Sequence, residues 1–155
     1  MAFTASLTGS AGVYFVASRL NAMGYHVGIT LGSVPTVDLL VSSRDGRASV
    51  CLQVKTSGCA MRTRGRGDGK VPHHYEWEIG WGCAHLNRAD LLYALVDLRE
   101  YQELPEVFIL PSRVICNYFE GGTPENWPRA RYHPLVKAIT PYRENWKLLK
   151  KKLGD

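Results

Sequence analysis

Hydrophobic residues recur at helical spacing near the start of the chain. One stripe between Gly9 and Met23 collects Val13, Val16, Ala17, Leu20 and Met23. This spacing predicts an amphipathic helix over 9–23. Gly24 follows it and suits the left-handed residue that commonly ends a helix. We expect a strand over Tyr25–Thr30 next, and then a Gly/Ser/Pro loop that leads to Asp38.

The pattern then changes to the two-residue period of a β-hairpin. Val37–Val41 and Ser49–Lys55 read as strands, and Asp45-Gly46 between them is a strong hairpin signal because glycine accepts positive φ. A two-residue loop at Asp45-Gly46 makes the numbers of paired residues sum to 91. Asp38 is then directly opposite Gln53, with Cβ atoms about 4.5–5.5 Å apart.

Side chains alternate along a strand, so Lys55 joins Asp38 and Gln53 on one face. The other face is wholly apolar and must be core: Val37, Leu39, Val41, Val50, Leu52 and Val54. We interpret the polar face as not core. A carboxylate, an amide and an ammonium group there suit a divalent metal and a phosphate. The alternative is that they are ordinary solvated residues on a half-buried sheet.

The remaining pattern predicts an α/β fold with a mixed sheet of about five strands and helices on its faces. Later strands are expected over His74–Ile79, Leu91–Leu98 and Glu106–Leu110. A turn or short helix is expected over Cys83–Ala89, and Ser112 is predicted to cap a helix that runs to Phe119. Glu120–Pro134 reads as a long connection, and Thr140 is predicted to cap a C-terminal helix with Pro141 in its first turn.

Length and composition favour a single domain over residues 1–155. Apolar residues make up 45% of the chain, enough to form one core. The chain contains no 18-residue apolar run, and its start lacks a basic region followed by a long apolar segment. We therefore expect a soluble, cytoplasmic protein that does not enter the membrane.

The four cysteines form no Cys-x-x-Cys pair and favour free thiols. Residues of zinc-binding type do occur, but their spacings match no known zinc motif: Cys59, His73, His74, Cys83 and His85.

The net charge of +5 is concentrated at one end of the chain. Residues 129–155 hold eight Lys or Arg against two Asp or Glu, whereas residues 1–128 hold eleven against twelve. Lys150, Lys151 and Lys152 could contact phosphate or simply complement the dipole of a helix C-terminus. The glycine-rich loop Thr56–Pro72 carries a second basic group that could order against nucleic acid or remain solvated: Arg62, Arg64, Arg66 and Lys70.

The order of these elements resembles the PD-(D/E)XK nuclease superfamily: a helix, a strand, a strand with Asp, and a strand that ends in Gln-x-Lys. More closely, the chain resembles an uncharacterised bacterial group of short proteins. The resemblance lies in Gly12–Ala17, Asp38–Val41, Gln53–Thr56, Phe108–Ser112 and Pro141–Arg143 with Trp146, and so spans most of the chain.

This resemblance implies a restriction-endonuclease-like fold and metal-dependent hydrolysis of DNA phosphodiesters. Asp38 would be the main metal ligand, with Gln53 and the Val54 carbonyl completing the protein side. Lys55 would orient or activate water, or stabilise the phosphorus centre. The implied metal is Mg²⁺ or Mn²⁺, and it would be weakly held.

Two departures keep a second hypothesis open. Val13 stands where the group has a helical Glu, and Gln53 stands at the superfamily's second acidic position. Glu76, Glu78 or a homodimer partner could supply a further carboxylate. Without one, the alternative is a catalytically inactive nuclease-fold module that binds nucleic acid or a protein partner.

Overall fold

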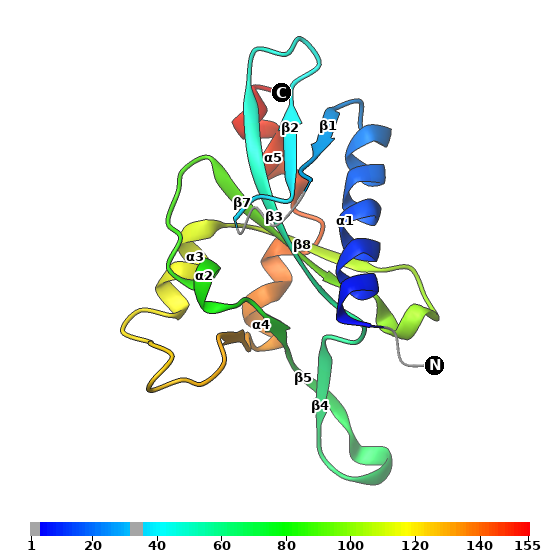
Figure 1. Cartoon of the computed structure of the whole chain (residues 1–155). Coiled ribbons are helices and arrows are strands. Elements are labelled where there is room, and N and C mark those ends of the chain that lie inside the picture. Colours follow the sequence, from blue (N-terminus) through cyan, green and yellow to red (C-terminus); the bar gives the residue numbers. More distant parts are fainter. Residues whose placement is uncertain (1–3, 32–35) are drawn as a thin grey trace.

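A mixed five-stranded sheet forms the centre of the molecule (Figure 1). The computed structural model describes residues 4–31 and 36–155, so residues 32–35 of the loop expected before Asp38 lie outside the described residues. The strand order is β1 (His26–Ile29), β2 (Leu39–Ser42), β3 (Ser49–Ser57), β7 (Leu91–Asp97) and β8 (Glu106–Pro111). β3 and β7 are parallel, and the other neighbours are antiparallel. The α/β prediction with about five strands is therefore confirmed.

Both faces of the sheet are covered, and β7 is buried along its whole length. The helices α1 (Ala5–Ala22) and α5 (Trp146–Leu153) pack on the face that holds Leu52, Val54 and Leu92. The opposite face holds Tyr93 and Leu95 and is covered by the remaining elements: α2 (Trp81–Ala84), α3 (Ser112–Tyr118), α4 (Val136–Ile139), β5 (Val71–Tyr75), β6 (Trp77–Glu78) and β9 (Arg131–Tyr132).

The second apolar layer corrects one expectation. The face that carries Gln53 was expected not to be core, but Gln53 pairs in register with Tyr93, and its side chain is 5% exposed. The cause is that β3 lies inside the sheet, where layers on both sides bury its residues. Gln53 is thus a buried polar residue and must be satisfied within the protein or by a ligand.

The hairpin register is as predicted, although the loop is longer. Leu39 pairs with Leu52 and Val41 with Val50, so the paired numbers sum to 91. The ladder continues to a bond from Ser43 N to Ala48 O, which leaves four residues in the loop instead of two. Only Gly46 has positive φ there, at 72°. A two-residue type I′ turn would need positive φ at both central positions.

Helix α1 approaches β3 closely at one glycine. Thr4 caps the helix by accepting a hydrogen bond from Leu7 N, and Gly24 follows its end with φ 89°. A Cβ atom built on Gly12 would lie 1.9 Å from Oγ1 of Thr56. Any side chain at position 12 would therefore push α1 away from the strand that carries Gln53 and Lys55.

Other predicted elements were wrong in detail, and the single strand expected over His74–Ile79 is divided between β5 and β6, which lie in different two-stranded sheets. The Thr56–Pro72 loop contains most of a second hairpin, β4 (Met61–Arg64) with β5, joined by a 3₁₀ turn at Gly67–Gly69. Ser112 does not cap α3; its hydroxyl accepts from Arg88 N and donates to Arg88 O. Residues Thr140–Tyr142 form a 3₁₀ turn after α4, so the C-terminal helix begins only at Trp146.

The short elements complete the fold. A 3₁₀ turn at Arg99–Tyr101 follows β7, and β9 interrupts the connection expected over 120–134. None of the helices formed by residues 4–31 and 36–155 has the length and apolar composition needed to cross a lipid bilayer.

Candidate active site

A cavity of about 460 Å³ lies where β2 leaves β3, beside the N-terminal half of α1. Asp38, Gln53 and Lys55 all line it, as the hairpin pattern predicted. Its other lining residues come from α1, from the end of β1 and from β3: Gly9, Ser10, Val13, Tyr14, Ile29, Thr30, Leu31 and Val54.

Asp38 is held in place by two hydrogen bonds to the same oxygen. Its Oδ2 accepts from Gln53 Nε2 at 2.5 Å and from Val54 N at 2.7 Å. Among the described residues, none donates a hydrogen bond to Oδ1. The carboxylate is therefore fixed through one oxygen, and the other remains available to a ligand.

Burial of Asp38 raises the pKa of its carboxyl, and this effect outweighs two opposing ones. The hydrogen bond from Val54 N and the positive charge of Lys55 both lower that pKa. The site thus holds a partly desolvated anion that a bound cation would stabilise.

Gln53, which lines the same cavity, also has an unpaired side-chain oxygen. A carboxylate can only accept, so the amide NH₂ of Gln53 must face Asp38, and this orientation fixes the position of Oε1. Oε1 is buried, and no described residue donates to it. An unpaired buried carbonyl oxygen lowers the stability of the folded state, and a ligand that pairs with this atom would remove that cost.

The main-chain carbonyl of Val54 is directed to the β2 side of β3, where the cavity lies. Leu52 O accepts from Asp38 N, and Val54 N donates to the Asp38 side chain, so even-numbered residues of β3 direct their backbone groups toward β2. The β2 ladder ends beside Asp38, which leaves the next carbonyl along β3 facing the cavity. The carboxylate and two neutral oxygens that the resemblance implied as metal ligands thus lie at one edge.

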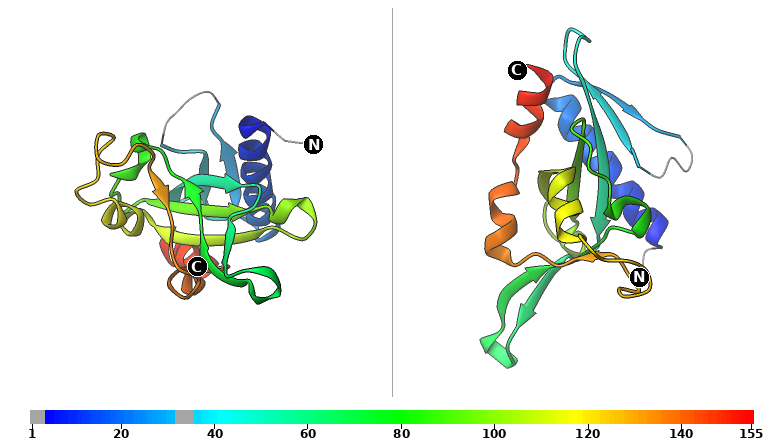
Figure 2. Two further views of the ribbon diagram at one scale, coloured as in Figure 1. Left: turned by 90° about the horizontal axis from the view of Figure 1, so that it is seen from below. Right: turned by 90° about the vertical axis from the view of Figure 1, so that its left-hand side faces the viewer.

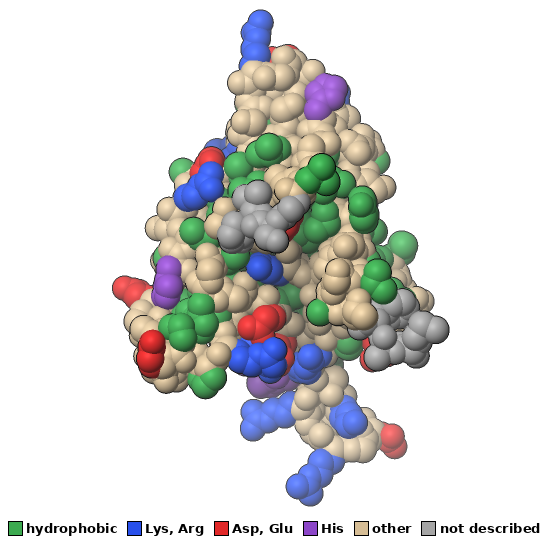
Figure 3. Space-filling view, in the orientation of Figure 1, with side chains coloured by type: hydrophobic (Ala, Val, Ile, Leu, Met, Phe, Trp, Pro, Cys, Tyr) green, Lys and Arg blue, Asp and Glu red, His purple; other side chains and the backbone are tan. Residues whose placement is uncertain are grey.

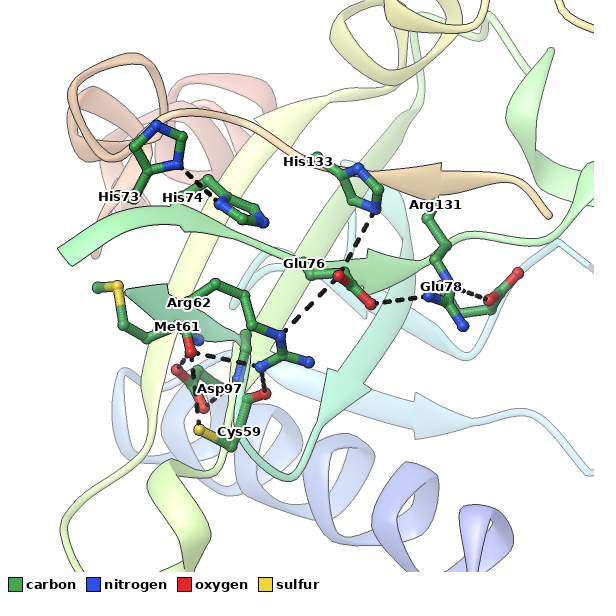
Figure 4. A network of polar contacts seen from close by, with 11 residues as sticks. Cys59, Met61, Arg62, His73, His74, Glu76, Glu78, Asp97, Arg131 and His133 are labelled. Carbon is green, nitrogen blue, oxygen red and sulfur yellow. Dashed lines mark hydrogen bonds and ion pairs between the residues drawn. The ribbon is translucent and has the colours of Figure 1, made fainter. Parts of the chain in front are cut away.

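The structure does not bring Glu76 or Glu78 to this cavity. Both carboxylates lie in a separate network of arginines around β6 and β9 (Figure 4). Glu76 is 3.2 Å from Arg131 and 3.9 Å from Arg62, and Glu78 is 3.2 Å from Arg129. Val13 lines the cavity without offering an oxygen. Asp38 is therefore the one acidic residue among the described residues of the lining.

The predicted basic residues fall into separate places. Arg62 folds back onto the protein, donating to Cys59 O and pairing with Glu76. Arg64, Arg66 and Lys70 are exposed on the β4–β5 hairpin, whose basic side chains project from the body in Figure 3. Lys150, Lys151 and Lys152 lie in the last turn of α5. In the right-hand view of Figure 2, α4 and α5 run along one side of the molecule and β1 and β2 along the other.

Sequence reasoning missed the Arg129–Arg131–His133 group beside Glu76 and Glu78. His133 Nε2 lies 3.7 Å from Glu76. No local motif identifies this group, because the pairing of β6 with β9 joins segments more than 50 residues apart. A charge excess after residue 128 was the available signal.

No zinc site forms from the cysteines and histidines. In the described part of the chain, no group of three or more His, Cys, Asp or Glu side chains is placed to hold a metal ion, and none of the four cysteines forms a disulfide. A metal at the Asp38 cavity would instead use one carboxylate and two neutral oxygens.

Comparison with solved structures finds the same fold in a bacterial homing endonuclease. The TM-score is 0.60, the identity is 18%, and the match covers 96% of this chain and 94% of that chain. No family model matches the sequence, and no curated protein sequence is significantly similar. At this identity the likeness establishes a nuclease-like fold for nearly the whole chain.

The raised pKa of Asp38 predicts that removing its charge stabilises the folded protein by an amount that depends on pH. In Asp38→Asn the side-chain oxygen can still accept from Gln53 and Val54. Because the folded-state pKa of Asp38 is raised, wild-type stability falls as pH rises through that pKa. Without metal, Asp38→Asn should therefore melt at a higher temperature than wild type at pH 7, and the difference should shrink toward pH 4.

Thermal unfolding in EDTA across this pH range measures the effect. Asp68→Asn, at an exposed position of the β4–β5 hairpin, is the matched control and should show no such gain. A lower melting temperature for Asp38→Asn at pH 7 would contradict the assignment of Asp38 as a carboxylate whose charged form is destabilised by burial.

Proposed function

We propose that this protein hydrolyses DNA phosphodiesters with a divalent metal bound at the Asp38 cavity. The observation that carries the proposal is the unpaired Oε1 of Gln53 beside the fixed carboxylate of Asp38. Asp38 Oδ1 and Gln53 Oε1 lie at one strand end, with the Lys55 ammonium on the same face. Together they would form a site for a cation and a phosphate.

The donor set fits Mg²⁺ or Mn²⁺. These ions take oxygen ligands, and Mg²⁺ keeps several waters and shares them with substrate phosphate. Asp38, Gln53 Oε1 and the Val54 carbonyl would hold the ion. When bound, it would supply Lewis acidity and lower the pKa of a bound water. A single carboxylate makes the affinity of the free protein weak and increases its dependence on substrate oxygens.

The chain's own residues divide the remaining work. The Gln53 and Val54 donors hold Asp38 in one orientation, so the carboxylate does not need to reorganise when a cation arrives. Lys55 is half-buried and close enough to Asp38 to lower its pKa. Its ammonium would contact the scissile phosphate and stabilise the negative charge that develops there.

DNA is the substrate that the charge distribution favours. The exposed arginines of the β4–β5 hairpin and the arginine network at its base offer phosphate contacts outside the cavity. The shared fold with a homing endonuclease supports the same substrate class. We propose that Arg64, Arg66 and Lys70 contact the DNA backbone, and that Arg62 positions the hairpin from its base.

Cleavage of plasmid and branched DNA with Mg²⁺ or Mn²⁺ tests the proposed activity. Asp38→Ala and Lys55→Ala should each lower the cleavage rate by about 10²–10³-fold, the usual cost of losing one group that stabilises developing charge. Glu125→Gln, at an exposed site far from the cavity lining, should cleave like wild type. Equal rates for all four proteins would refute the assigned site.

A catalytically inactive binding module is the second candidate, and the lone carboxylate favours it. Val13→Glu tests this point by placing a second carboxylate at the cavity wall. Because ligand charge sets affinity for hard cations, the variant should bind Mn²⁺ about tenfold or more tightly than wild type in titration calorimetry. Ser18→Glu adds the same charge to an exposed α1 position and should leave Mn²⁺ affinity unchanged.

Negligible Mn²⁺ binding by both wild type and Val13→Glu would mean that the cavity does not hold a metal. The binding module would then be the better account. A homodimer that shares carboxylates between chains would instead give wild-type Mn²⁺ affinity that rises with protein concentration.

The hairpin contacts predict a change in salt dependence. Each phosphate contact contributes about 0.9 to the slope of log affinity against log salt on duplex DNA. Replacing Arg64, Arg66 and Lys70 together by Gln should flatten that slope by up to about 2–3 units, measured by fluorescence anisotropy. The control Lys137→Gln with Lys147→Gln alters exposed lysines outside the hairpin. A slope that stays the same in the triple variant would exclude the hairpin from DNA contact.

A further inference from the structure

A second cavity, of about 430 Å³, lies between α5, α3 and the segment before β7. It shares no lining residue with the Asp38 cavity. Basic side chains from three distant segments surround it: Arg88, Arg113, Lys151 and Lys152. Its remaining lining residues are uncharged: Asn87, Ala89, Pro111, Ser112 and Leu148.

Hydrogen bonds between the three segments fix the walls of this cavity. The Ser112 hydroxyl on α3 accepts from Arg88 N at 2.9 Å and donates to Arg88 O at 2.7 Å. Lys152 Nζ on α5 donates to Ala89 O. The three segments that form the walls are thus joined without a ligand, and of the cationic side chains Lys152 is itself part of this hydrogen-bonded framework.

The charges at this cavity are unequally compensated. Arg88 is paired with Asp90 through two hydrogen bonds, at 3.0 and 2.5 Å, so its charge is largely neutralised. In the described residues, Arg113, Lys151 and Lys152 have no carboxylate partner within ion-pair distance. An excess of three positive charges therefore surrounds one space.

The dipole of α5 accounts for only a small part of this excess. A helix C-terminus carries about half a negative charge, and Lys150, Lys151 and Lys152 all lie in the last turn. Lys150 does not line the cavity, so Lys151 and Lys152 converge with Arg113 at a place that the helix end alone does not explain. Like charges around a fixed space repel one another unless an anion occupies it.

We propose that this cavity binds a phosphate group, independently of the Asp38 site. Arg113 supplies a planar guanidinium group that matches phosphate oxygens, and Lys151 and Lys152 supply two further donors. The apolar surface of Pro111 and Leu148 would contact the group that carries the phosphate. Lys151 and Lys152 then belong to a separate binding site and do not extend the candidate active site.

Thermal unfolding in inorganic phosphate tests the site without any cleavage assay. At constant ionic strength, replacing chloride by phosphate should raise the melting temperature of wild type by a few degrees, because a ligand that binds only the folded state stabilises it. Arg113→Gln with Lys151→Gln should lose this rise. Neither side chain makes a hydrogen bond to another described residue, so the variant should fold.

The matched control is Lys147→Gln with Lys150→Gln, which removes the same charge from exposed positions outside the lining. It should keep the full response to phosphate. Equal responses in the two double variants would overturn the proposal, because phosphate would then act only as a general salt. A response that disappears in Asp38→Ala would also overturn it, by placing the phosphate at the other cavity.

Anisotropy with labelled duplexes identifies the source of the phosphate. Weaker binding of an unphosphorylated duplex by Arg113→Gln/Lys151→Gln than by the control variant assigns the cavity to the nucleic-acid backbone. A difference seen only with a 5′-phosphorylated duplex assigns it to a strand end. Unchanged duplex binding together with a lost response to inorganic phosphate assigns it to a small phosphate compound. Each result supports the cavity as a phosphate site.

Discussion

The hydrogen bonds that Asp38 Oδ2 accepts from Gln53 and Val54 are the interaction on which the candidate site depends. They form where β2 stops pairing with β3, so one side chain replaces the backbone ladder at the point where the two strands separate. The same bonds determine which way the Gln53 amide faces. As a result Oε1 of Gln53 is left without a partner among the described residues, close to the Asp38 carboxylate at the end of one strand.

This arrangement stores unfavourable energy in the folded protein. An unpaired buried amide oxygen and a partly desolvated carboxylate both lower stability, and sites that do so are commonly functional. A cation would relieve both costs at once, because it supplies a partner for Gln53 and a counter-charge for Asp38. A sheet that required only stability would place apolar residues at these positions, as it does at Leu52 and Val54.

The basic residues are spread over three surfaces, each built differently. The β4–β5 hairpin exposes cations at its tip, whereas Arg62 and Arg131 at its base are held by Glu76. Lys151 and Lys152 line a second cavity together with Arg113. Cations that carboxylates hold in place lose less side-chain entropy on contact with phosphate than free ones do. Net charge alone therefore describes this protein poorly, and its partners depend on where each charge is held.

The sequence by itself determined the register that brings Asp38 to Gln53, because the two-residue period and a turn centred on Asp45-Gly46 are local properties, even though the loop has four residues instead of two. It also indicated the helix over 9–23 and the buried strands. Only the tertiary structure decided that Gln53 is buried, since this depends on the pairing of β3 with β7 and on a second apolar layer. It likewise decided that Glu76 pairs with arginines from two other segments and that Lys151 lines a cavity together with Arg113. Such contacts join distant segments, and no local pattern encodes them.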